Sequence, residues 1–214
     1  MSRLALATAG ALLLAGPAFA QARSVEFTVD RTVFTVPLIP GYCDEGEAVE
    51  GYLKQQRRDN PGSLPDVVMM PCGARGEGPI DMFLVFVSRK SGGTNRRADL
   101  LDFLTRTLPV VPGEGDLSAE PGATVTERLS ARLARRVGAE AEVRPVGVDE
   151  VCAYVGGRTT RAGGTDLTGS GCTTVISGYV FQVSRYRTGS DPAQAAASIP
   201  EVKALALSIG AQRQ

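Results

Sequence analysis

The chain has 214 residues, with 23 Lys and Arg against 23 Asp and Glu, and it contains no histidine. A balanced charge provides no electrostatic attraction for nucleic acid, so nucleic acid is not expected as a partner. The absence of histidine excludes Ser-His-Asp and Cys-His catalysis and H-E-x-x-H zinc sites. The sequence also lacks a P-loop, G-x-G-x-x-G and G-x-S-x-G. We therefore expect a protein that is not an enzyme and that uses no cofactor.

The first 20 residues have the pattern of a secretory signal peptide. Arg3 provides a positive start, residues 4–15 form an apolar core, and Ala18-Phe19-Ala20 is a typical cleavage site. The apolar core is shorter than the roughly 20 residues that span a bilayer. We expect cleavage after Ala20 and a periplasmic or secreted product without a transmembrane segment. Residues 21–214 would then form one domain.

Short periodic runs separated by Gly and Pro predict an alternation of strands and helices. Residues 25–29 and 33–36 alternate apolar and polar side chains around Asp30-Arg31, which is typical of a β-hairpin. Residues 82–87 are continuously apolar, which predicts a central strand covered on both faces. Residues 109–122 have no such pattern and are expected to form a long loop within the domain. The other elements predicted before residue 150 are a helix from Asp44 to Asn60, a strand at 67–70, a helix starting at Thr94 or Asn95, a helix at 124–137 and a strand at 142–148.

Residues 152–187 are predicted to form a three-stranded antiparallel meander. Ser177-Gly178 lies between two β-rich runs at the spacing of a two-residue hairpin. Such a turn pairs Ile176 with Tyr179, and the alternation of side chains then creates one apolar face. The side chains on that face are Cys172, Thr174, Ile176, Tyr179, Phe181 and Val183.

A helical pattern follows the meander. Asp191-Pro192 combines an N-cap with a proline at the first helical position. We expect a terminal helix that is interrupted at Pro200. Its predicted apolar positions are Val202, Leu205, Leu207 and Ile209.

The four cysteines, Cys43, Cys72, Cys152 and Cys172, are even in number, and an exported protein is oxidised. Three connectivities are possible. A three-residue loop at 161–163 would bring Cys152 opposite Cys172, at a distance that suits a disulfide. We therefore favour Cys43–Cys72 and Cys152–Cys172. The alternative, a metal site, is not expected, because no pair has C-x-x-C spacing and histidine is absent.

One basic loop could bind an anion. It runs from Arg89 into a predicted helix start, where backbone N–H groups and nearby cations could hold a phosphate or a carboxylate. The alternative is a flexible charged loop, because the Gly-Gly pair matches no phosphate fingerprint. The residues of this possible anion site are Lys90, Gly92, Gly93, Arg96 and Arg97.

The order of these elements favours an α+β domain with a mostly antiparallel β-sheet and helices packed against it. A hairpin ending in Pro40-Gly41-Tyr42, a helix, a meander and a terminal helix ending near Leu207-Ser208-Ile209 together resemble the PsbP-like α/β sandwich group. The resemblance covers most of the mature chain. It implies an extrinsic, non-catalytic protein on the outer side of a membrane, and it carries over no binding residue.

The sequence thus predicts an exported, disulfide-stabilised, non-catalytic binding or interaction protein of the bacterial cell envelope. Its partner would be an unknown envelope protein or a small ligand, and its oligomeric state is left open. The alternatives are a carboxylate- or Ser-dependent hydrolase and a periplasmic small-ligand carrier. A cleft with two carboxylates of raised pKa would favour the hydrolase. A deep apolar pocket behind the sheet would favour the carrier.

Overall fold

The computed structural model describes residues 23–44, 65–74, 79–89, 93–107, 140–160 and 166–213. Four predicted features lie outside these residues, namely the signal peptide, most of the helix expected after Asp44, the long loop at 109–122 and the helix at 124–137. No helix in the described part of the chain is both long and apolar enough to cross a membrane.

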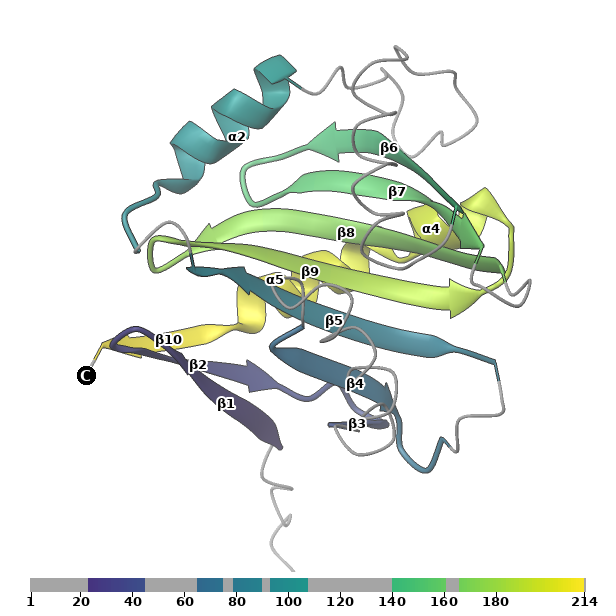
Figure 1. Cartoon of the computed structure of the whole chain (residues 1–214), viewed down its shortest axis with the longest axis horizontal. Helices are drawn as coiled ribbons and strands as arrows, with labels where there is room; N and C mark the ends of the chain where they lie inside the picture. Colours follow the sequence, from purple (N-terminus) through teal and green to yellow (C-terminus); the bar gives the residue numbers. More distant parts are fainter. Residues whose placement is uncertain are drawn as a thin grey trace, which may run out of the picture.

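The described residues form two antiparallel sheets and three helices (Figure 1). The small sheet has the order β1-β2-β10, and the large sheet has the order β3-β4-β5-β9-β8-β7-β6. This confirms the predicted α+β fold with a mostly antiparallel sheet and helices against it. The strands are β1 (Ser24–Val29), β2 (Thr32–Pro37), β3 (Tyr42–Asp44), β4 (Val67–Pro71), β5 (Asp81–Ser88), β6 (Glu140–Val148), β7 (Ala153–Thr160), β8 (Asp166–Ile176), β9 (Tyr179–Thr188) and β10 (Gly210–Arg213), and the helices are α2 (Arg97–Thr107), α4 (Pro192–Ala197) and α5 (Ile199–Ser208).

The β8–β9 hairpin has the predicted register. Ile176 lies opposite Tyr179 across a two-residue turn, and both turn residues, Ser177 and Gly178, have positive φ. A primed turn requires this conformation, and the right-handed twist of the strands favours it. All six side chains of the predicted apolar face are buried.

The register between β7 and β8 differs from the prediction by two residues. Tyr154, not Cys152, lies opposite Cys172. The described ladder ends with Thr160 opposite Asp166, where a loop at 161–163 would have paired Thr160 with Gly164. The Thr160 hydroxyl donates a hydrogen bond to the Asp166 carboxylate at 2.6 Å. A slip of two residues leaves every side chain on its original face, so the predicted apolar face is unaffected.

The main core lies between the inner face of the large sheet, the small sheet and α5. Phe34 of β2 is fully buried, and its ring meets Tyr179 and Phe181 of β9 edge-on, with centroids 5.5 and 4.9 Å apart. Helix α5 contacts β8, β9 and β2 and therefore joins the two sheets. Strand β5 is covered on both faces as predicted: Phe83 faces this core, while Leu84 belongs to a second apolar cluster.

The terminal helix is interrupted, but at Ser198 and not at Pro200, and one of its predicted apolar positions was wrong. Pro200 lies in the first turn of α5, where a proline is tolerated because the N–H that it lacks would have no partner within the helix. Asp191 caps α4 by accepting a hydrogen bond from the N–H of Ala193, and Ser198 separates α4 from α5. Val202 and Leu205 are buried, whereas Leu207 is 57% exposed because it lies on the side of α5 that faces away from the core. The chain then continues as β10, a strand without apolar alternation that the sequence did not predict.

Candidate functional site

A pocket of about 550 Å³ opens between the segment that follows β2 and one side of α5. Its walls are mainly apolar, and its polar side chains include Arg185 and Glu201. The lining residues are Pro37, Leu38, Ile39, Pro40, Tyr42, Phe83, Arg185, Glu201, Ala204, Leu205 and Ser208.

Arg185 reaches this pocket because it continues the inner face of β9. Side chains alternate along a strand, so Arg185 and Arg187 follow Phe181 and Val183 on the same side of the sheet. Phe181 and Val183 are fully buried, and the Arg185 side chain is only 6% exposed. An arginine on the core face must be paired, because an unpaired buried charge is costly.

The Arg185 guanidinium is held by acidic and aromatic side chains from separate elements. Its Nε and Nη2 donate to the two carboxylate oxygens of Asp81 at 3.0 and 2.8 Å, which is the bidentate geometry. Nη2 also donates to the Tyr42 hydroxyl at 2.7 Å, and Nη1 pairs with Glu201. The guanidinium carbon lies 4.7 Å from the centroid of the Phe83 ring, which adds a cation–π contact.

These contacts fix the charges in the pocket. Burial by itself raises the pKa of Asp81, but the hydrogen bonds from Arg185 and Tyr42 and the two arginine charges outweigh it, so the pKa lies below its ordinary value. Burial, and then the hydrogen bond to Asp81, raise the pKa of Tyr42 to about 12. Asp81 is therefore ionised and Tyr42 protonated near neutral pH. Neither has the pKa of a general acid or base that works near pH 7.

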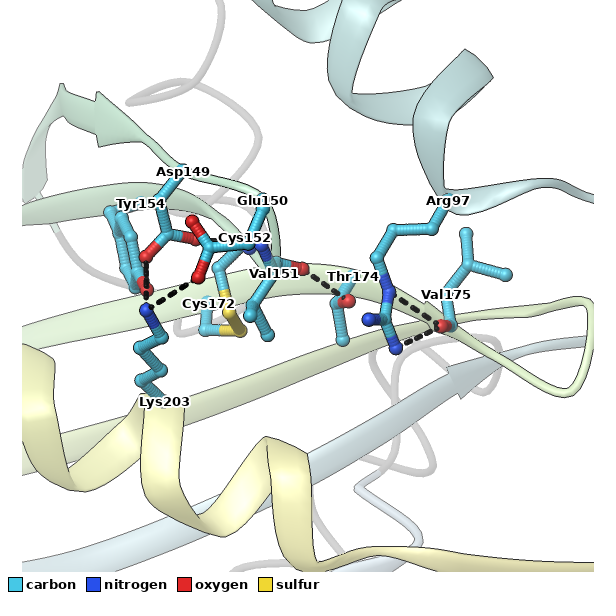
Figure 2. The surroundings of a disulfide bond; sticks show 10 residues. All are labelled: Arg97, Asp149, Glu150, Val151, Cys152, Tyr154, Cys172, Thr174, Val175 and Lys203. Atoms are coloured by element: carbon cyan, nitrogen blue, oxygen red, sulfur yellow. Dashed lines mark hydrogen bonds and ion pairs between the residues drawn. A yellow bond between two sulfur atoms is a disulfide. The ribbon is translucent and has the colours of Figure 1, made fainter.

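A second polar cluster lies beside the buried disulfide (Figure 2). One oxygen of Asp149 accepts hydrogen bonds from the N–H groups of Val151 and Cys152, both at 2.8 Å. Its other oxygen accepts from the Tyr154 hydroxyl at 2.8 Å and from Lys203 of α5 at 2.6 Å. Asp149 thus ties the turn before β7 to the helix. We assign this cluster a structural role.

Both predicted disulfides are present. Cys43–Cys72 and Cys152–Cys172 have Cα atoms 5.0 and 5.3 Å apart. Cys152 and Cys172 are fully buried, as expected for a bridge on the core face, whereas Cys72 is exposed. The first bridge fastens β3 to the end of β4, next to the pocket residue Tyr42.

The predicted anion loop is only partly described, since Lys90 and Gly92 lie outside the described residues. Arg97 donates from Nε and Nη2 to the carbonyl of Val175 at 3.3 and 3.1 Å, and Arg96 is exposed. A Cβ on Gly93 would lie 2.9 Å from the Tyr179 ring. The close approach of the loop to the β8–β9 turn explains Gly93 and the orientation of Arg97. Anion binding stays a prediction.

The Arg185 cluster was missed by the sequence analysis, although one signal was available. The predicted β9 register places position 185 in phase with Phe181 and Val183, so an arginine there would be expected on the buried face. Its partners Tyr42, Asp81 and Glu201 are far away in the sequence and have no local pattern. Among the described residues, no group of three or more metal-ligating side chains comes together.

Comparison with solved structures gives a likeness in fold. No family model matches the chain, and no curated protein matches it. The solution structure of cyanobacterial PsbP (CyanoP) from Synechocystis sp. PCC 6803 matches over 95% of this chain and 98% of its own length, with 14% identity and a TM-score of 0.37. It carries the name of the group that the order of elements resembles. Nothing about ligands or partners follows from a superposition at this level.

Proposed function

We propose that this chain is an exported, non-catalytic binding protein of the cell envelope, and that it binds a small, largely apolar ligand in the pocket beside Arg185. The observation that carries the proposal is the pocket itself. A volume of about 550 Å³ lies within the range of about 300–1,000 Å³ that small-molecule sites occupy. Apolar walls with a few fixed polar groups are the usual composition of such sites.

The polar groups of the pocket favour binding over catalysis. Two carboxylates of raised pKa in one cleft would indicate a hydrolase. The pocket contains Glu201, and Asp81 lies behind Arg185, but the pKa of Asp81 is lowered by its contacts with Arg185 and Tyr42. A carboxylate held in a bidentate pair with a buried arginine acts as a fixed counter-ion.

Export is supported by the two disulfides. Bridges of this kind persist in oxidising compartments and are rare in the cytosol. The pattern of residues 1–20 supports the same location.

The pocket is tested by titrating the protein with 1-octanol in a calorimeter, with one blocked variant and one matched control. Ala204 lines the pocket, so Ala204→Trp fills it with an indole ring. Leu207 lies one turn further along α5, is exposed and does not line the pocket, so Leu207→Trp adds the same group elsewhere. We expect octanol to bind the wild type and the Leu207→Trp variant and not the Ala204→Trp variant. Equal binding to all three proteins, or none to the wild type, would contradict the proposal.

A further inference from the structure

The two carboxylates that pair with Arg185 are not equivalent. Asp81 makes the bidentate contact, accepts a hydrogen bond from Tyr42 and does not line the pocket. Glu201 lines the pocket, is 43% exposed and comes from the first turn of α5. Asp81 is therefore the built-in counter-ion, while Glu201 is the carboxylate on the side from which a ligand would enter.

A single carboxylate oxygen marks the point where two arginines converge. Nη1 of Arg185 and Nη2 of Arg187 both pair with Oε2 of Glu201, the latter at 3.5 Å. Their side chains lie on the same face of β9, two residues apart, so their spacing is fixed by the strand. Guanidinium groups match the geometry of planar oxyanions.

We propose, building on the binding function above, that the ligand is an apolar molecule with a carboxylate head, and that Glu201 stands in this structure where that head would bind. Arg185 and Arg187 carry two positive charges and Asp81 one negative charge. If Glu201 swings away, one positive charge is left, which a monoanion neutralises. When Glu201 moves away, the buried Arg185 keeps its bidentate pair with Asp81 and its hydrogen bond to Tyr42. The Glu201 side chain is already 43% exposed, and the entering carboxylate replaces the charge that it removes. The apolar body would lie against Leu38, Ile39 and Leu205.

The test compares three ligands that share one chain and differ in the head group, namely octanoate, 1-octanol and octylammonium. Calorimetry is carried out on the wild type and on Glu201→Gln, which removes the competing charge and keeps the shape of the side chain. We expect the substitution to tighten octanoate binding by about tenfold or more, which is the value of a charge-assisted hydrogen bond. Octanol binding should change far less than octanoate binding, because the octanol hydroxyl carries no charge.

Two further variants keep the test decisive. Arg187→Gln removes one of the two converging donors at a residue that is 30% exposed, and it should weaken octanoate binding far more than octanol binding. Glu150→Gln removes one negative charge at an 80% exposed site that pairs with Lys203 and lies outside the pocket lining, so it should change neither.

Other outcomes would overturn the inference in distinguishable ways. If octylammonium is the preferred ligand and Glu201→Gln abolishes its binding, Glu201 itself recognises a donor head group. If octanoate and octanol bind equally in every variant, the pocket binds apolar molecules without recognising their head group. In that case the inference fails and only the proposed function stands. If none of the three ligands binds any variant, the proposed function fails as well.

Discussion

Asp149 provides a test of how a single side chain holds the meander to the terminal helix. Burial by itself raises its pKa, but the hydrogen bonds from Lys203, Cys152, Tyr154 and Val151 outweigh burial and lower the pKa from 3.8 to about 2. One pKa unit corresponds to about 1.36 kcal/mol, so folding is stabilised by about 2 kcal/mol while Asp149 is ionised. The side chain is 28% exposed, so solvent screens this only in part.

The perturbation is Asp149→Asn, which leaves one oxygen for the Val151 and Cys152 N–H groups but turns an NH2 towards Lys203 and Tyr154. We expect the free energy of unfolding at pH 7, measured with urea, to fall by about 2 kcal/mol. Because the folded pKa is lowered, the wild-type advantage is complete above pH 3.8 and disappears as the pH falls through about 2. Glu150→Gln removes the same charge at an exposed position and should change stability by less than about 0.5 kcal/mol. A loss that stays constant down to pH 2, or that Glu150→Gln reproduces, would show that the ionised Asp149 carboxylate does not stabilise the fold through these contacts.

Three other predictions concern the bridges, the pocket and export. Cys152→Ser should decrease the free energy of unfolding by an amount near the upper end of about 2–5 kcal/mol, and Cys43→Ser by an amount near the lower end. The reason is that only Cys152→Ser leaves a hydroxyl and an unpaired thiol in the core. The reverse order in denaturant unfolding would contradict this. Tyr42→Phe deprives the buried Arg185 of an acceptor and should destabilise by about 1–2 kcal/mol in the same assay, and no change would show that water replaces the hydroxyl. Sequencing of the protein recovered from the producing cells should begin at Gln21, and a start at Met1 would refute signal cleavage.

Local patterns predicted those parts of the fold that depend on neighbouring residues. Ser177-Gly178 predicted the register between β8 and β9 correctly, because a two-residue turn permits only one pairing of the strands that it connects. Asp191-Pro192 predicted the start of α4 through capping chemistry that lies within a few residues. The disulfide partners also followed, since a slip of two residues between β7 and β8 keeps Cys152 and Cys172 on one face.

Features that depend on distant contacts could not be predicted in this way. Strand β10 is a short run whose only reason to be extended is pairing with β2, which begins at Thr32 and lies at the other end of the chain. The register between β7 and β8 places Thr160 opposite Asp166, which the turn residues at 161–163 did not predict. The pocket assembles Tyr42, Phe83, Arg185 and Glu201 from four elements, and no spacing in the sequence connects them.

Backbone NMR of the wild-type protein titrated with 1-octanol tests whether the space beside Arg185 is a ligand site. We expect saturable chemical-shift changes confined to the residues around the pocket, with the largest at Leu38, Ile39, Ala204 and Leu205. Octanol has no charge, so this result does not depend on which head group the arginines prefer. If these residues show no shifts, or if the shifts map to the β1-β2-β10 sheet or spread over the surface without saturating, the pocket is not a ligand site.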